Sequence, residues 1–123
     1  DYTMICAGVF DDMVATLVLE NKEAILERNR QIVEKNLAIM DAWIAKEPKA
    51  SWIRPASVST SFVKLDVDRP IEDFALELLQ DYGVLVVPGN RFDKESHVRI
   101  GYCCDKEVLQ KGLEKLSQFL NKC

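Results

Sequence analysis

The sequence predicts an α+β fold, in which helices cover one side of a small mixed or antiparallel sheet of three to four strands. Three observations lead to this prediction. Residues 22–46 repeat apolar side chains at helical spacing, which predicts one long helix near the N-terminus. Residues 97–103, HVRIGYC, alternate as the side chains of a strand do. Helical patterns also occupy residues 71–82 and 105–120.

The N-terminal part is expected to hold two helices. Asp11 and Asp12 can cap a first helix that runs to about residue 19, and Asn21 can cap a second one. The second helix is expected to end before Pro48. About 25 residues at 1.5 Å per residue give a helix of roughly 37 Å, which exceeds the diameter expected of such a small domain. We therefore expect part of this helix to lie against something outside the chain.

The strands are expected in the second half of the chain. The run FVKLDV at 62–67 predicts a strand, with a neighbouring strand around Trp52 and Ile53. Gly83 is expected to close the helix over 71–82 in the left-handed conformation. The run VLVV at 84–87 is apolar on both faces, which predicts a central strand.

Composition limits the class of protein. The chain has 123 residues, of which 48% are hydrophobic and 29% charged, which fits one domain with its own core. The net charge of -4 argues against a nucleic-acid partner. The longest apolar runs fall short of the roughly 18 residues of a membrane span, and there is no signal-peptide pattern. We expect a cytoplasmic protein without membrane contact.

Cysteines and histidine give little reason to expect a metal or a cysteine nucleophile. The four cysteines, at positions 6, 103, 104 and 123, form no C-x-x-C pair and are read as reduced thiols. His97 is the single histidine, so a histidine-rich metal site is excluded. The chain also begins at Asp1 without an initiator methionine, and we expect a processed or excised segment.

Arg99 is the main candidate for a functional residue. It shares one face of the strand with His97 and Cys103, while the apolar residues take the other face. A guanidinium is charged at any relevant pH, so at a partly buried position it needs an anionic partner. From the residue alone, the simpler interpretation is an ion pair with a carboxylate of this chain. The candidate carboxylates are Asp66, Glu95 and Asp105.

Taken together, several stretches resemble the C-terminal small domain of class I/II aminotransferases, which are pyridoxal-phosphate enzymes of fold type I. They are DYT at the start, ILERNR at 25–30, FVKLD at 62–66, the PG-x-x-F loop at 88–92 and R-I-G at 99–101. The resemblance implies that residues 1–123 are this small domain. Within it, residues 1–20 would be the residual end of the large domain and 22–46 the long interdomain helix. Residues 3–8 would lie near the interface of a homodimer.

Carried over by position, the resemblance implies that Arg99 binds the α-carboxylate of the substrate. Gly89 would let its loop pass close to the mouth of the active site, and Phe92 would form part of the apolar wall. The lysine that forms the Schiff base, and most groups that bind the cofactor, would lie upstream. No residue here is therefore assigned to catalysis or to pyridoxal phosphate. The isolated chain would bind no cofactor, while the full-length enzyme would exchange an amino group between α-amino acids and keto acids.

Three hypotheses stay open at this point. The chain is the carboxylate-binding part of an aminotransferase, a freestanding α+β module that binds amino acids through Arg99, or a structural or dimerisation domain in which Arg99 only makes an ion pair. The first predicts a large cofactor-binding domain encoded upstream. The second predicts ligand binding by this chain alone, and the third predicts neither.

Overall fold

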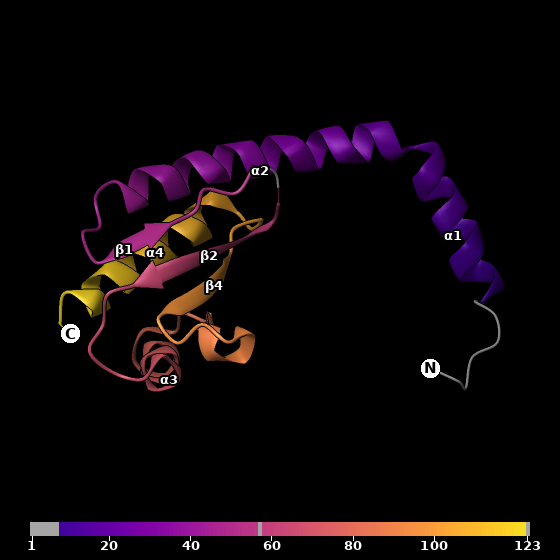
Figure 1. The fold of residues 1–123 in the computed structure, drawn as a ribbon. Coiled ribbons are helices and arrows are strands. Elements are labelled where there is room, and N and C mark those ends of the chain that lie inside the picture. The colour runs from indigo at the N-terminus through magenta and orange to yellow at the C-terminus, as the bar shows by residue number, and fades with distance from the viewer. Residues whose placement is uncertain (1–7, 57, 123) are drawn as a thin grey trace. The chain divides into compact units, whose positions relative to one another are not determined.

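A computed structural model of the chain describes residues 8–56 and 58–122. The helices and strands follow one another in the predicted order (Figure 1). They are α1 (Val9–Glu20), α2 (Lys22–Ile44), β1 (Ala50–Trp52), β2 (Thr60–Leu65), α3 (Ile71–Tyr82), β3 (Val87–Pro88), the short 3-10 helix η1 (Gly89–Phe92), β4 (His97–Gly101) and α4 (Lys106–Leu120).

The four strands form one sheet in the order β1-β2-β4-β3, and every neighbouring pair is antiparallel. The predicted α+β class and the small antiparallel sheet are thereby confirmed. In the register of β2 and β4, Val63 lies opposite Val98 and Phe62 lies opposite Arg99. Residues that lie opposite each other share a face of the sheet, so this register places Val63 and Val98 on one face and Phe62 and Arg99 on the other.

The core lies on one face of the sheet. The inward-facing residues of β2 and β4 include Val63, Leu65 and Val98, which are almost completely buried. In Figure 1, α4 passes behind the strands, and its side chains belong to the same hydrophobic cluster as those of α3 and the C-terminal part of α2. Helices on one side of the sheet are what the sequence predicts. The other face of the sheet, called the outward face below, carries Phe62, Lys64, His97 and Arg99.

The chain divides into two compact units, with the boundary between Gln31 and Ile32 inside α2. The first unit contains α1, in which no side chain is buried. The helix begins at Val9, with Gly8 at the cap position. The prediction that Asp11 and Asp12 cap this helix is therefore wrong. Their carboxylates lie in the first turn, where negative charge favours the helix dipole without capping it.

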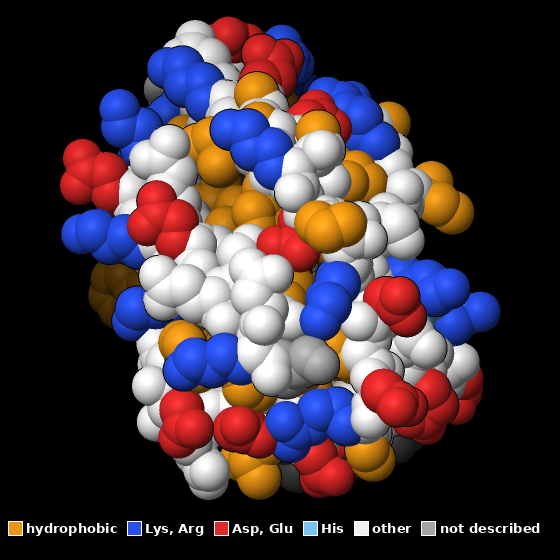
Figure 2. All heavy atoms as spheres, turned by 90° about the vertical axis from the view of Figure 1, so that its left-hand side faces the viewer, with side chains coloured by type: hydrophobic (Ala, Val, Ile, Leu, Met, Phe, Trp, Pro, Cys, Tyr) orange, Lys and Arg blue, Asp and Glu red, His pale blue; other side chains and the backbone are white. Residues whose placement is uncertain are grey.

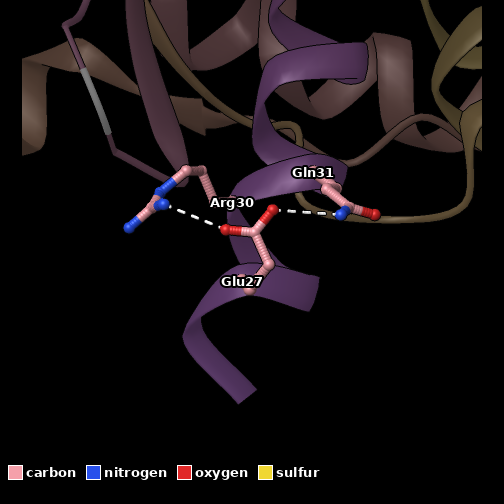
Figure 3. A network of polar contacts seen from close by, with 3 residues as sticks. All are labelled: Glu27, Arg30 and Gln31. Atoms are coloured by element: carbon pink, nitrogen blue, oxygen red, sulfur yellow. Dashed lines mark hydrogen bonds and ion pairs between the residues drawn. The ribbon is translucent and has the colours of Figure 1, made fainter. Parts of the chain in front are cut away.

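The first unit also holds the N-terminal half of α2, whose side chains are all exposed. Figure 3 shows a local network there: Glu27 accepts one hydrogen bond from Arg30 at 2.9 Å and another from Gln31 at 3.0 Å. Pairs three and four residues apart stabilise a helix by only a few tenths of a kcal/mol each. Such contacts support the helix but do not replace the burial that this half lacks.

In the second unit, α2 joins the core. Leu37 and Met40 are buried, and Trp43 packs against the cluster. The amide of Asn36, which is also buried, donates to the carbonyl oxygens of Tyr102 at 2.6 Å and Cys104 at 2.7 Å. This side chain ties α2 to the end of β4. The helix ends at Ile44, two residues before the predicted end.

The segment after α3 differs from the prediction. Gly83 closes α3 in the left-handed conformation, with φ of 66°, as predicted. Residues 84–86 then run outside the sheet, and only Val87 and Pro88 pair with β4. β3 is thus an edge strand, and the prediction of a central strand at 84–87 is wrong. Pro88 has no backbone N–H to donate to a further strand, which suits an edge position.

The last helix, α4, is capped at its N-terminus by Asp105. The carboxylate of Asp105 accepts a hydrogen bond from the backbone N–H of Glu107 at 2.8 Å. Leu113 and Leu116 are buried in the core, while Val108 is 62% exposed. The indole N–H of Trp43 donates to the hydroxyl of Ser117 at 2.8 Å, which links α4 to α2.

The surface mixes charges of both signs. On the face drawn in Figure 2, Lys and Arg side chains lie among Asp and Glu side chains, with hydrophobic atoms visible between them. No helix within the described residues is both long and apolar enough to cross a membrane.

Candidate functional site

The candidate site lies on the outward face of the sheet, around the middle of β4. Arg99 lies opposite Phe62 of β2 on one side and opposite Val87 of β3 on the other. Antiparallel pairing places these three side chains on the same face. The alternation in 97–103 predicts that Arg99 points away from the apolar face of the strand. The structure agrees, since Val98, Ile100 and Tyr102 are buried on the opposite face.

Arg99 is exposed, whereas the sequence predicts a partly buried position. It makes no ion pair with any residue in the described ranges 8–56 and 58–122, Asp66, Glu95 and Asp105 included. The carboxylate of Asp105 caps α4 instead. The guanidinium of Arg99 is therefore accessible and not neutralised by these three carboxylates.

The guanidinium of Arg99 lies over the ring of Phe92, with its central carbon 5.3 Å from the ring centroid. A cation at this distance from an aromatic face is attracted by the ring electrons. Phe92 ends the short helix η1, and 46% of its surface is exposed. The structure thus brings together two of the three predicted site residues.

Phe92 is held in turn by Phe62. The two rings meet edge to face, with centroids 5.9 Å apart and an angle of 86° between their planes. Phe62 also stacks on His97, with centroids 5.0 Å apart. The sequence predicts only a strand position for Phe62. The pairing register, which a single sequence does not reveal, places it beside Arg99.

Gly89, the third predicted residue, is buried at the start of η1. A Cβ atom at this position would overlap the backbone carbonyl oxygens of Lys94 and His97. The close approach also lets the N–H of Lys94 donate to the carbonyl of Gly89 at 3.0 Å. The local reason for a glycine is therefore the packing of the loop against its own backbone.

The loop is also fixed to α3. Asn90 donates from its side-chain amide to one carboxylate oxygen of Glu72 at 2.8 Å, and Arg91 pairs with the other oxygen. Both partners of Glu72 come from η1, so the loop that carries Phe92 is tied to a helix of the core. Such anchoring limits the movement of the short helix that carries Phe92.

His97 lies at the start of β4, as predicted, and is half-buried. Burial, and then the charges of Lys94 and Lys64, lower the pKa of His97. Its Nδ1 atom is buried and has no hydrogen-bond partner among the described residues. His97 is therefore a mainly neutral ring that supports Phe62 at neutral pH.

Cys103 lies just beyond the end of β4 and is exposed. Partial desolvation of the thiol, and then the neighbouring Cys104, raise the pKa of Cys103. A raised pKa reduces the fraction of reactive thiolate.

In the part of the chain that the structure describes, no group of three or more His, Cys, Asp or Glu side chains could hold a metal ion.

The chain matches the family described as "Aminotransferase class I and II" over residues 5–116. The chain belongs to the class I and II aminotransferase family. One member of known structure, a PLP-dependent aminotransferase from Streptococcus suis 89-1591, is 66% identical to it with a TM-score of 0.95, over 99% of this chain and 33% of that one.

Curated relatives in the family are more distant. Capreomycidine synthase from Streptomyces vinaceus is 27% identical over 98% of this chain and 31% of its own length. The probable N-acetyl-LL-diaminopimelate aminotransferase of Bacillus subtilis strain 168 is 28% identical over 98% of this chain and 31% of its own length. The chain thus spans about a third of the length of the family members that it matches.

Proposed function

We propose that the chain is the C-terminal small domain of a pyridoxal-phosphate-dependent aminotransferase and that Arg99 binds the α-carboxylate of an α-amino acid. The observation that carries this proposal is the exposed guanidinium of Arg99, which has no ion pair within the described residues. Membership of the aminotransferase family gives that unpaired charge a partner, the carboxylate of the substrate.

The chemistry of the guanidinium explains why an arginine suits this role. Its planar fork can donate two parallel hydrogen bonds to one carboxylate, which fixes both the position and the orientation of the substrate. Orientation would matter in amino transfer, because a carboxylate held in one position fixes the direction of the Cα–H bond of the substrate. A lysine would keep the charge but lose this orientation.

Phe92 and Gly89 complete the proposed site. The ring of Phe92 lies against the guanidinium and would form part of an apolar wall beside the substrate. Removal of water from such a wall strengthens the pairing of Arg99 with a carboxylate. Gly89 would let the loop of η1 pass close to the mouth of the site.

The aromatic and guanidinium groups of the site do not fit pyridoxal phosphate itself. Once Arg99 holds a carboxylate, the cluster of Phe62, Phe92, His97 and Arg99 has no second guanidinium or hydroxyl group for a phosphate ester. We assign the cofactor to the upstream part of a large domain whose end is residues 1–20, in a homodimeric cytoplasmic enzyme. When bound, pyridoxal phosphate supplies the electron sink for the amino transfer, and residues 22–46 would form the interdomain helix.

Substitution of Arg99 by lysine in the full-length enzyme tests the proposal. Arg99→Lys should lower kcat/KM for the best amino-acid substrate by about 10- to 100-fold, equivalent to roughly 1.5–3 kcal/mol. Arg54→Lys is the matched control and should leave kcat/KM unchanged, because Arg54 is also exposed but pairs with Asp41 of α2. Kinetics that do not change in Arg99→Lys would refute the role of Arg99.

A second candidate function comes from the similarity to capreomycidine synthase. The same carboxylate clamp could serve a synthase or lyase instead of a transaminase. Product analysis of the full-length enzyme separates them, since transamination releases a keto acid.

The freestanding alternative predicts that this chain alone binds amino acids, which calorimetric titration with a panel of amino acids would detect.

A further inference from the structure

The ring of Phe62 contacts the rings of Phe92 and His97, which lie beside the proposed carboxylate site. Phe62 lies directly opposite Arg99 in the register of β2 and β4. One side of its ring stacks on His97, with an angle of 21° between the planes, and its contact with Phe92 is edge to face at 86°. These three rings come from β2, β4 and η1, so Phe62 joins the sheet to the loop.

Phe92 needs such a contact to keep its position. It ends a 3-10 helix of four residues, and the next residue, Asp93, takes the left-handed conformation with φ of 57°. The side chains of Asn90 and Arg91 tie η1 to Glu72 of α3, but these bonds leave the torsions of the Phe92 side chain free. The edge-to-face contact with Phe62 restrains that ring.

The position of Phe92 matters to Arg99 because its ring is what the guanidinium lies over. No ion pair with a described residue restrains Arg99 from another side. The contacts therefore form a series from His97 through Phe62 and Phe92 to the guanidinium. On this arrangement, a shift of the Phe62 ring would reach Arg99 through Phe92.

We infer that Phe62 is a positioning residue for the carboxylate site: through the ring of Phe92 it sets the orientation of the Arg99 guanidinium. This inference rests on the proposed function of Arg99. Phe62 acts on substrate recognition without contact with the reacting atoms. Its effect is then specific to substrates that carry an α-carboxylate.

The test compares two substrates of the full-length enzyme. One is the best amino acid of a panel of the common amino acids, and the other is the amine with the same side chain and no carboxylate. The ratio of kcat/KM for the amino acid to kcat/KM for the amine measures recognition of the carboxylate. Phe62→Leu, which keeps an apolar side chain without the ring, should lower this ratio about 3- to 10-fold.

Two further variants separate positioning from stability. Phe62→Tyr keeps the ring and should restore the ratio to within about twofold of the original. Phe74→Leu makes the same exchange in the core of α3, where the ring is fully buried. It should lower the thermal midpoint without a change in the ratio. If Phe62→Leu does not fold, Phe62→Met replaces it in the same comparison.

The effect of Phe62 should also depend on Arg99. In the Arg99→Lys background, Phe62→Leu should change the ratio by less than it does alone, because the two residues act on one interaction. If Arg99→Lys leaves the ratio unchanged, the proposed function itself fails. Two other outcomes overturn only the positioning role of Phe62, provided that Arg99→Lys lowers the ratio. In the first, Phe62→Leu leaves the ratio unchanged. In the second, Phe62→Leu lowers kcat/KM equally for the amino acid and the amine, which also leaves the ratio unchanged.

Discussion

At the scale of single residues, the candidate site combines Arg99 and Phe92, which could be read from the sequence, with Phe62, which could not. Arg99 stands out because a charged residue interrupts an otherwise apolar strand. Phe62 does not stand out, since an aromatic residue is common in a strand. Only the register of β2 and β4 shows that the two lie opposite each other.

Gly89 gives a residue-scale prediction about stability. Gly89→Ala should destabilise the protein by about 1–3 kcal/mol, because the new Cβ would overlap two backbone carbonyl oxygens that cannot rotate away. Urea unfolding followed by circular dichroism measures the change. The matched control is Gly112→Ala, in α4, where a Cβ would meet no atom within 4 Å. It should be neutral or gain up to about 1 kcal/mol. Equal destabilisation by both substitutions would contradict the explanation.

At the scale of elements, the sequence predicts helices better than it predicts short strands. Asp105 and Gly83 mark the start of α4 and the end of α3, because caps act within one turn of the helix. At Asp11 and Asp12 the same reasoning fails, since acidic residues also favour the first turn of a helix. The strand predicted at 84–87 fails because pairing, and not composition, decides whether an extended segment joins a sheet.

The cap of α4 allows a test of this element. Asp105→Ala should lower the free energy of unfolding by about 1 kcal/mol, because the N–H of Glu107 loses its acceptor. Asp105→Ser keeps a side-chain acceptor and should retain most of the stability. Urea unfolding of the three proteins measures both effects. A Ser variant as unstable as the Ala variant would show that capping is not what Asp105 contributes.

At the scale of the whole molecule, the chain holds more apolar surface than its own core uses. Phe10, Met13, Val14 and Leu17 form a stripe along α1, and each is more than half exposed, from 58% to 83%. Exposed apolar stripes of this kind usually mark an interaction surface. The rest of the large domain, as proposed above, would cover this stripe in the complete enzyme.

This gives a prediction at the same scale. Leu17→Lys should lower the thermal midpoint of the full-length enzyme, because a charge would enter a covered apolar surface. In the isolated 123-residue chain it should instead reduce self-association, as measured by sedimentation velocity. Thr16→Lys adds the same charge beside the stripe and should do neither. A full-length enzyme unaffected by Leu17→Lys would argue against a covered α1.

The sequence by itself determined the class of fold, the order of the elements, the limits of α3 and the direction in which Arg99 points. These properties depend on spacing and on caps, which act over a few residues. The tertiary structure decided the rest: the place of β3 at the edge of the sheet, the burial of Gly89 and the position of Phe62 beside Arg99. These depend on pairing between segments that are far apart in the chain, and no local pattern encodes that pairing.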